Sequence, residues 1–157
     1  MAAANNVTRM LDARKITYKV FKIPAVKLSA IEVSDYLHMP PEDVYKTIVL
    51  RREKRGKAIL AVVPAAREVD PKKLAEFLKE KKISVTTQRN AEKMTGLLSG
   101  GISPLVLIHK GFQVVIDESA LERGKILISG GQRGLQIQLA VQDLVKLTHA
   151  KTAHIST

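Results

Sequence analysis

The sequence predicts one α/β (α+β) domain over residues 1–157, with a mixed β-sheet and helices outside it. Stretches with helical periodicity alternate along the chain with short apolar stretches that are typical of strands. A charged segment with one glycine, 52–57, separates two of these strands and predicts a hairpin, so part of the sheet is antiparallel. The length is sufficient for one hydrophobic core, and no long linker, internal repeat or low-complexity segment interrupts it.

The N-terminal part of the chain predicts two short helices with a strand between them. We expect a helix over 7–15 with Asn6 as its N-cap, and then a strand over 16–23 that ends at Pro24. A second helix is expected from about residue 29, because three apolar residues recur there at helical spacing: Val33, Tyr36 and Leu37. A proline-led helical turn then leads into the next strand.

The predicted hairpin joins a strand over 43–50 to a strand over 57–64. The second of these is apolar at every position from 58 to 63, so we expect both of its faces to be covered. The clearest helix follows, with Asp70 as its cap and Pro71 at its first position. Its apolar stripe consists of Leu74, Phe77 and Leu78.

The C-terminal half predicts a short strand, a short helix, three longer strands and a final helix. The short elements are expected at 83–85 and 90–96, and the final helix at 141–149. The three strands are expected at 113–117, 125–129 and 135–141. In the last of them, apolar residues alternate with Gln136 and Gln138, so one face of that strand is polar.

The composition favours a polyanionic partner and excludes several kinds of site. Lys and Arg number 26 against 15 Asp and Glu, a net charge of +11 that is typical of nucleic-acid binding, although an unspecialised basic surface would give the same sum. The absence of cysteine excludes disulfides, thiolate zinc sites and a Cys nucleophile. The four histidines lack metal-ligand spacing, so no metal is expected. Without a signal peptide or a membrane-length apolar run, we expect a cytoplasmic protein with no membrane partner.

Lys46 is the candidate catalytic residue, because it lies on the apolar face of its strand. Val44, Ile48 and Leu50 alternate along that strand, and Lys46 falls on the same face as all three. One interpretation is a lysine whose ammonium group reaches out to solvent past apolar neighbours. The other is an ammonium group at the mouth of a pocket, where it attracts an anion or a developing oxyanion.

Two glycine-rich segments, 95–104 and 129–134, are candidate binding loops. Paired glycines allow positive φ and a close approach of the backbone to a ligand, but the same pattern is also ordinary in turns. Neither segment is a Walker A loop or a GxGxxG motif. The sequence GISPL at 101–105 is not the GxSxG nucleophile elbow, which leaves Ser103 without an evident base.

Four segments in this order resemble the YbaK/EbsC family: VYKTIVL, GGISPL, SGGQRGLQIQLA and DLVKL. Members of that family are free-standing Cys-tRNA(Pro)/Cys-tRNA(Cys) deacylases, related to the editing insertion of bacterial prolyl-tRNA synthetases. The similarity runs from about residue 7 to about residue 155. It implies the family's editing-domain fold with a mixed, barrel-like sheet, and hydrolysis of a mischarged aminoacyl ester on tRNA.

The resemblance also implies roles for particular residues. The family's essential lysine corresponds to Lys46. The loop that would hold the aminoacyl end near the terminal adenosine consists of Gly100, Gly101, Ile102, Ser103 and Pro104. The second loop that would line the same pocket consists of Ser129, Gly130 and Gly131. No metal or organic cofactor is implied. In cysteine-specific members the thiol of the substrate attacks the ester, which would explain why the sequence shows no protein nucleophile or general base.

Two departures from the family pattern bear on specificity. Gln136 replaces an expected aspartate, and Ile23 lies where a tyrosine is expected. The leading interpretation is therefore a deacylase of mischarged Cys-tRNA(Pro), and a sibling enzyme for Ala-tRNA(Pro) or another small aminoacyl-tRNA is the alternative. A non-catalytic RNA-binding or regulatory protein on the same fold is the third. We expect a monomer that acts on tRNA(Pro), with prolyl-tRNA synthetase as a partner that selects the tRNA.

Overall fold

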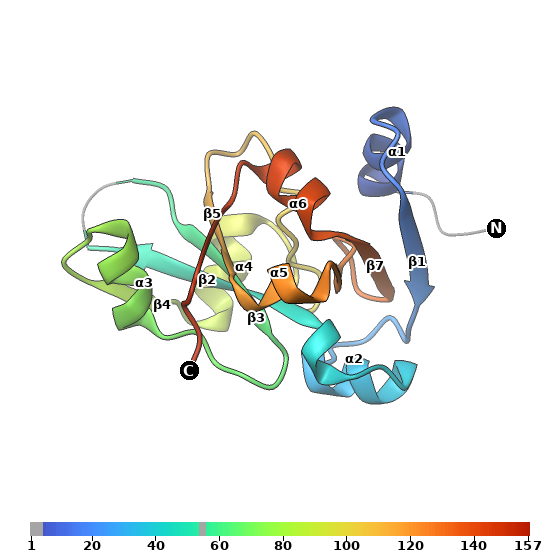
Figure 1. Ribbon diagram of the computed structural model, residues 1–157, viewed down its shortest axis with the longest axis horizontal. Coiled ribbons are helices and arrows are strands. Elements are labelled where there is room, and N and C mark those ends of the chain that lie inside the picture. Colours follow the sequence, from blue (N-terminus) through green and yellow to red (C-terminus); the bar gives the residue numbers. More distant parts are fainter. Residues whose placement is uncertain (1–4, 54–55) are drawn as a thin grey trace.

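The computed structural model describes residues 5–53 and 56–157, which form two β-sheets with helices packed around them (Figure 1). The helices are α1 (Asn6–Ala13), α2 (Ala30–Leu37), the 3₁₀ helix η1 (Pro41–Asp43), α3 (Pro71–Leu78), α4 (Gln88–Thr95), α5 (Ser119–Arg123) and α6 (Val141–Thr148). The strands are β1 (Tyr18–Lys22), β2 (Tyr45–Arg52), β3 (Ile59–Pro64), β4 (Ile83–Val85), β5 (Gln113–Asp117), β6 (Lys125–Ser129), β7 (Leu135–Ala140) and β8 (Lys151–Ala153).

The larger sheet is mixed, as the sequence predicts, and has the strand order β4-β2-β3-β5-β8. β2 pairs antiparallel with β3 and with β4, whereas β3–β5 and β5–β8 are parallel pairs. The predicted hairpin is thus the β2–β3 pair, in which Lys46 lies opposite Val63. Its charged connection includes Lys54 and Arg55, which lie outside the described residues.

The smaller sheet is antiparallel, in the order β1-β7-β6. A parallel bridge between Val44 and Leu127 joins the start of β2 to β6 and so brings the two sheets together. The described strands form two open sheets and not one closed barrel, so the barrel-like sheet implied by the family resemblance is an overstatement.

The core lies on both faces of β3, as the uninterrupted apolar run of that strand predicts. Leu60 and Val62 point into a large cluster with α6 and the smaller sheet. Ile59, Ala61 and Val63 point into a second cluster beneath α3. Every residue from Ile59 to Val63 has 0% exposed surface. A third, smaller cluster packs α2 against the start of β2 through Val33, Val44 and Leu127.

Most predicted element ends are confirmed, and the differences have local causes. Ser29 and Asp70 cap α2 and α3, with Pro71 at the first position of α3. The cap of α1 is Asn5 and not Asn6, because Asn5 and Thr8 exchange two hydrogen bonds in a capping box, each 2.9 Å long. The short helix α5 and the short strand β8 were not predicted, since neither carries enough periodic apolar residues for a clear pattern.

Two predicted core residues lie on the surface instead. Tyr36 is 54% exposed and Phe77 is 40% exposed. The stripe that packs against the core is narrow in both helices: Val33 and Leu37 in α2, and Leu74 and Leu78 in α3. Short helices at the rim bury a narrower stripe than the periodic pattern suggests.

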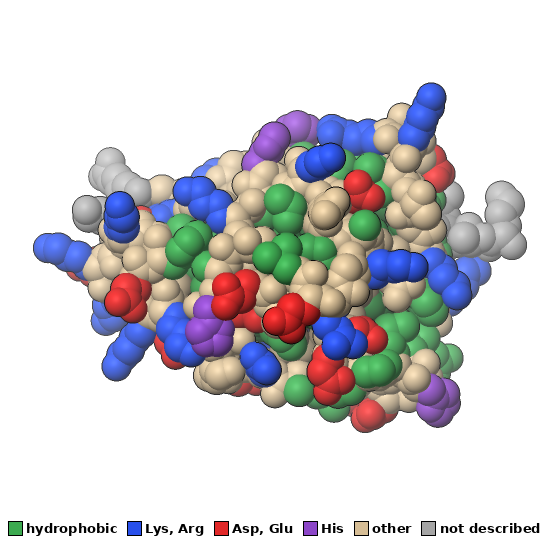
Figure 2. All heavy atoms as spheres, viewed as in Figure 1, with side chains coloured by type: hydrophobic (Ala, Val, Ile, Leu, Met, Phe, Trp, Pro, Cys, Tyr) green, Lys and Arg blue, Asp and Glu red, His purple; other side chains and the backbone are tan. Residues whose placement is uncertain are grey.

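The surface carries the excess of basic residues without one dominant patch on the face shown in Figure 2. Lys and Arg side chains are scattered across that face, and several acidic side chains gather near its lower centre. None of the helices in the described part of the chain has the length and apolar content needed to cross a membrane.

A buried carboxylate fixes the C-terminal segment to the larger sheet. Asp117, at the end of β5, is 0% exposed and accepts backbone N–H bonds from Ile155 (3.0 Å) and Ser156 (3.1 Å). Its other oxygen accepts a 2.5 Å hydrogen bond from the Ser119 hydroxyl. Burial pushes the pKa of Asp117 up, but the hydrogen bonds from Ser119 and Ile155 outweigh burial and hold that pKa below its usual range.

Replacing this carboxylate tests the role of the network. Asp117→Asn keeps one oxygen for the N–H groups of Ile155 and Ser156 but puts an N–H₂ group where the Ser119 hydroxyl now donates, so the free energy of unfolding should fall by about 1–3 kcal/mol. Because the folded-state pKa of Asp117 is lowered, its contribution is present above the ordinary pKa of 3.8 and is lost as the pH falls through the folded value. Urea unfolding at pH 7 and at lower pH measures this. Wild type and variant should differ most at pH 7, and a difference that grows in acid would contradict the assignment.

Candidate active site

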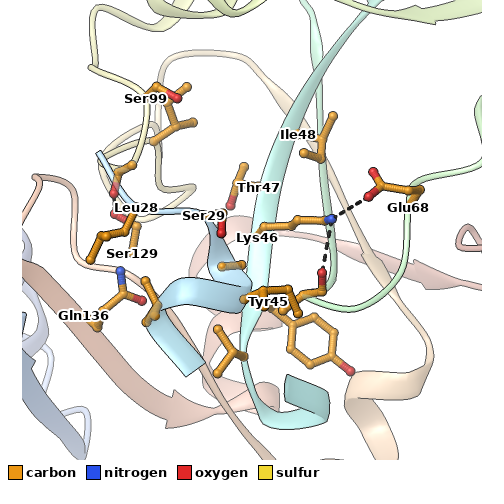
Figure 3. Close-up of a pocket in the computed structure, with 17 residues that line it drawn as sticks. Leu28, Ser29, Tyr45, Lys46, Thr47, Ile48, Glu68, Ser99, Ser129 and Gln136 are labelled. Atoms are coloured by element: carbon orange, nitrogen blue, oxygen red, sulfur yellow. Dashed lines mark hydrogen bonds and ion pairs between the residues drawn. The ribbon is translucent and has the colours of Figure 1, made fainter. Parts of the chain in front are cut away.

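A cavity of about 370 Å³ opens beside the first half of β2 (Figure 3). Its walls come from the start of α2, from β2, from the segment after β3, from the two glycine-rich loops and, through Gln136, from β7. Both apolar and hydroxyl-bearing residues line the walls. The residues with a hydroxyl group are Ser29, Tyr45, Thr47, Ser99 and Ser129.

Lys46 lies at this cavity and is held by two oxygen atoms. Its Nζ donates to the carbonyl oxygen of Ala65 (3.3 Å) and to Oε1 of Glu68 (3.2 Å). The Lys46 side chain is 21% exposed, whereas that of Glu68 is 77% exposed. The ammonium group is thus neither buried away from water nor free in it, and it faces a cavity large enough for a small ligand.

The apolar face of β2 has a gap where Lys46 lies. Val44 packs below it in the cluster with Val33, and Leu50 packs above it in the cluster beneath α3. Lys46 falls between these clusters and lines the cavity, and so does Ile48, which packs against the cluster beneath α3. A charge on this face is tolerated because no apolar partner covers the position and oxygen ligands lie within reach.

The two glycine-rich loops are bonded to each other. The Ser129 hydroxyl donates to the carbonyl oxygen of Gly100 (3.1 Å) and accepts from the N–H of Gly131 (3.3 Å). Arg133 Nε donates to the carbonyl oxygen of Ser99 (2.7 Å). The bonds from Ser129 to Gly100 and from Arg133 to Ser99 join residues 29 and 34 positions apart along the chain, so the two loops form one continuous rim of the cavity.

The structure brings part of the predicted site residue set to the cavity. Lys46, Gly100, Ile102 and Ser129 line it, and so does Gln136, which is 6% exposed. Ile23 is not among the lining residues and packs in the cluster around Val33. The remaining predicted residues do not line it: Gly101, Ser103, Pro104, Gly130 and Gly131.

The predicted residues that do not line the cavity have packing roles. Ser103 is 0% exposed, and its hydroxyl accepts a 3.2 Å hydrogen bond from the N–H of Leu105 within a turn. A Cβ on Gly130 would lie 2.8 Å from the Leu135 side chain, and a Cβ on Gly131, where φ is +97°, would overlap Val106. Gly101 has no positive φ, but its Cβ would lie 3.0 Å from Cα of Gln132. These glycines allow the loops to pack closely.

Glu68 is the functional candidate that the sequence alone did not indicate. It lies 22 positions from Lys46 and belongs to no motif. The hairpin register was the available signal: Tyr45 pairs with Pro64, so the residues just after β3 must fall beside the start of β2. Leu28, Ser29 and Ile31 were also missed, because nothing in their sequence distinguishes a pocket wall from an ordinary helix start.

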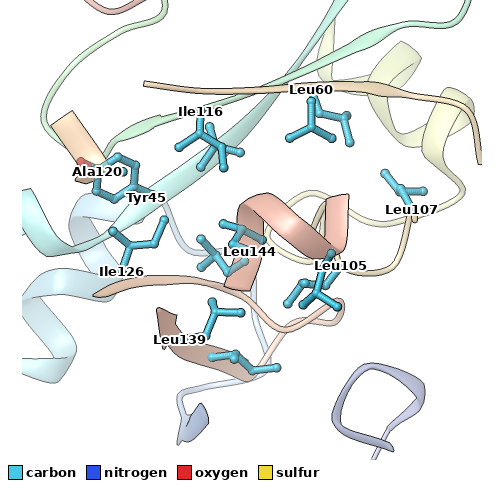
Figure 4. Packing of buried hydrophobic residues seen from close by; sticks show 14 of the residues in the cluster. Tyr45, Leu60, Leu105, Leu107, Ile116, Ala120, Ile126, Leu139 and Leu144 are labelled. Atoms are coloured by element: carbon cyan, nitrogen blue, oxygen red, sulfur yellow. The ribbon is translucent and has the colours of Figure 1, made fainter. Parts of the chain in front are cut away.

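The site has charge and hydrogen-bond donors but no evident protein nucleophile. Tyr45 contributes to the wall, yet its hydroxyl lies 2.7 Å from Ser119 Oγ and its ring packs in the main core (Figure 4). Burial raises the pKa of the Tyr45 phenol, so this group is not a base at neutral pH. No group of three His, Asp or Glu side chains able to hold a metal occurs in residues 5–53 and 56–157. The arrangement suits stabilisation of an oxyanion on a bound ligand.

Comparison with known proteins gives consistent matches over most of the chain. Residues 24–147 match the aminoacyl-tRNA editing domain family. The chain is 34% identical over 154 residues to EbsC of Enterococcus faecalis, provisionally named a Cys-tRNA(Pro)/Cys-tRNA(Cys) deacylase; the match covers 97% of this chain and 93% of EbsC. It is 24% identical to the prolyl-tRNA editing protein ProX of Acetoanaerobium sticklandii, over 96% of this chain and 93% of ProX.

Solved structures share the fold. A hypothetical protein superimposes with a TM-score of 0.88 at 20% identity, covering 98% of this chain and 100% of its own. A protein provisionally described as a trans-editing enzyme for prolyl-tRNA synthetase gives a TM-score of 0.78 at 21% identity, with 99% of both chains covered. The two-sheet architecture is therefore the one these proteins have.

The contact between the two glycine-rich loops can be tested at Gly101. Gly101→Ala should displace the turn at Gln132 and lower the free energy of unfolding by about 1–3 kcal/mol, the usual cost of overpacking. Hydrogen–deuterium exchange should show faster exchange in residues 129–134. Gly124→Ala is the control, because φ is +74° there but no atom lies within 4 Å of the new Cβ. Equal exchange in 129–134 for both variants would show that the two loops do not depend on each other.

Proposed function

The chain belongs to the aminoacyl-tRNA editing domain family, and we propose that it hydrolyses the ester bond of mischarged Cys-tRNA(Pro) in the cavity beside Lys46. It is an aminoacyl-tRNA hydrolase of the trans-editing kind, like the relatives that match it along nearly their whole length. The observation that carries the substrate proposal is the Lys46 ammonium group at a cavity whose rim is formed by Gly100 and Ser129.

The size and walls of the cavity support a small aminoacyl group. A volume of about 370 Å³ is near the lower end for small-molecule sites. Ile48 and Ile102 offer apolar contact for a side chain, and the hydroxyls of Ser99 and Ser129 offer hydrogen bonds to a ribose. The backbone of Gly100, with φ at +91°, leaves room for the terminal adenosine to approach the rim.

In the proposed reaction the cysteine thiol of the substrate is the nucleophile. Its sulfur bonds to the ester carbonyl carbon, the bond from that carbon to the ribose oxygen breaks, and the thiol proton passes to the ribose oxygen. Water then opens the cyclic thioester and releases free cysteine. Lys46 stabilises the negative charge that develops on the carbonyl oxygen in the first step. This assignment agrees with cavity walls that offer donors and no activated Ser, His or Asp.

The partners follow from the same proposal. A net charge of +11 favours contact with the phosphates of tRNA(Pro), and prolyl-tRNA synthetase is the proposed partner that selects the tRNA body. A monomeric, single-domain protein in the cytoplasm stays our prediction. A deacylase for Ala-tRNA(Pro) would use the same cavity, because one small side chain differs from another by only about 1–3 kcal/mol of binding energy per methylene.

The substrate is tested by a panel of tRNA(Pro) charged separately with Cys, Ala, Ser and Pro. Cys-tRNA(Pro) should be hydrolysed fastest, with the same rate in EDTA as without it, because no step needs a metal. Preferential hydrolysis of Ala-tRNA(Pro) would replace the substrate and rule out a thiol nucleophile. No hydrolysis of any of the four would leave an RNA-binding role on this fold.

Lys46 is tested by two substitutions. Lys46→Ala should slow single-turnover deacylation by about 10²–10³-fold, the usual cost of losing one preorganised donor. Lys46→Arg should restore only part of the rate, since a planar, longer guanidinium does not place its charge where the ammonium group lies. Thermal melts should stay near wild type for both. A folded Lys46→Ala protein with unchanged turnover would show that the charge is structural only.

Binding to tRNA should weaken steeply with salt. Each phosphate neutralised by a Lys or Arg releases counterions, which lowers the logarithm of the association constant by about 0.7–0.9 per tenfold rise in salt. A titration of uncharged tRNA(Pro) from low to physiological salt measures the slope. An affinity that does not change with salt would remove the electrostatic part of the proposal.

A further inference from the structure

Two opposite charges line the cavity, and they are paired with each other. Among the residues that line it, Lys46 and Glu68 are the two with ionisable side chains of opposite sign, and their Nζ–Oε1 distance is 3.2 Å. In Figure 3 the two side chains extend toward each other from β2 and from the segment after β3. A ligand that enters the cavity therefore meets a cation and an anion side by side.

This ion pair differs from the other two among the described residues. Arg52 and Glu80 are both 15% exposed, and Arg123 and Asp43 are 38% and 27% exposed. In neither of those pairs is a partner as exposed as Glu68. Glu68 is 77% exposed, so its carboxylate can exchange partners at little desolvation cost.

The backbone under Glu68 is nevertheless fixed. Its N–H donates to Thr157 Oγ1 (3.3 Å), and its carbonyl oxygen accepts from the N–H of Thr157 (2.9 Å). The next residue, Val69, forms an antiparallel bridge with Ser156. An exposed carboxylate on a backbone held from both sides is positioned at the cavity before any ligand arrives.

The substrate of the proposed reaction needs both charges. An aminoacyl ester carries an α-ammonium group on the carbon next to its carbonyl carbon, so a cation and a developing oxyanion lie close together. We propose that Glu68 binds the α-ammonium group of the aminoacyl ester while Lys46 binds the carbonyl oxygen. This inference rests on the proposed function, and it adds a recognition role for a residue outside the glycine-rich loops.

The exchange of partners conserves every charge interaction. In the free protein Lys46 and Glu68 satisfy each other, and in the complex each binds the group of opposite sign on the ester. The carbonyl oxygen of Ala65 can continue to accept from Lys46 throughout. A substrate with a blocked amine breaks this balance, because Glu68 is then covered without a donor, which is costly.

The consequence is selectivity for a free amino group. Aminoacyl-tRNA has that group, whereas peptidyl-tRNA and N-formylated initiator tRNA carry an amide in its place. All of these tRNAs carry the same kind of ester on the same terminal adenosine. Recognition of the ammonium group would therefore prevent hydrolysis of peptidyl-tRNA and of N-formylated initiator tRNA. A site that hydrogen-bonds a polar group rejects analogues that lack it.

The test compares a free and a blocked amine on the same tRNA. Single-turnover hydrolysis is measured for the aminoacyl-tRNA(Pro) that the wild-type protein cleaves fastest and for its N-acetyl derivative. The proteins are wild type, Glu68→Gln, Glu68→Asp, and Glu76→Gln as the matched control. Glu76 is an exposed glutamate on α3 and does not line this cavity.

We expect wild type and Glu76→Gln to prefer the free amine by about tenfold or more, the range of one charge-assisted hydrogen bond. Glu68→Gln should reduce that preference to near one while still cleaving the N-acetyl ester, and Glu68→Asp should keep part of it. A preference that Glu68→Gln leaves unchanged, or none in wild type, would overturn the role of Glu68 and leave the deacylase intact. If wild type cleaves no aminoacyl-tRNA, the proposed function fails and this role with it.

Discussion

The ammonium group of Lys46 must find oxygen ligands on a strand face that is otherwise apolar. It finds one because β3 ends at Pro64: the N–H of Ala65 still pairs with Val44 (2.8 Å), and the carbonyl oxygen of Ala65 accepts from Lys46 instead of from another strand. Glu68 supplies the second ligand from the same segment. A charge that would be costly in a continuous core is thus stabilised at the point where the pairing of β2 and β3 stops.

The cavity at that point depends on the meeting of the two sheets. The bridge between Val44 and Leu127 brings β6 to the start of β2, and β6 ends at Ser129, which lies at the rim. The hydrogen bond from Ser129 to Gly100 fixes the other loop in place. Because the rim is assembled from backbone atoms and small side chains, it can approach a ligand closely without a large loss of side-chain entropy.

Apart from the short strand β8, the strands and the inward lysine could be predicted from the sequence, since strong periodicity and fully apolar runs determine both. Which residues of the glycine-rich loops line the cavity, and which pack against the other loop, could not be predicted. Gly100 faces the cavity and Gly101 faces Gln132. This difference depends on which side of one loop packs on the other loop, and two adjacent glycines in a sequence give no sign of it. Glu68 was missed for a similar reason, because its place comes from the register of a hairpin and from contacts with Thr157. The exposed Tyr36 shows the limit of periodicity in a short rim helix.

The central claim is that the ammonium group of Lys46 acts on the aminoacyl carbonyl inside this cavity. The most direct measurement is a crystal structure of the protein with a non-hydrolysable amide analogue, cysteine linked to 3′-amino-3′-deoxyadenosine. We predict that Nζ of Lys46 lies about 3 Å from the amide carbonyl oxygen, within hydrogen-bond distance, with the adenosine at the rim formed by Gly100 and Ser129. An analogue bound elsewhere, or in this cavity with its carbonyl turned away while Lys46 keeps only Ala65 and Glu68, would contradict the account.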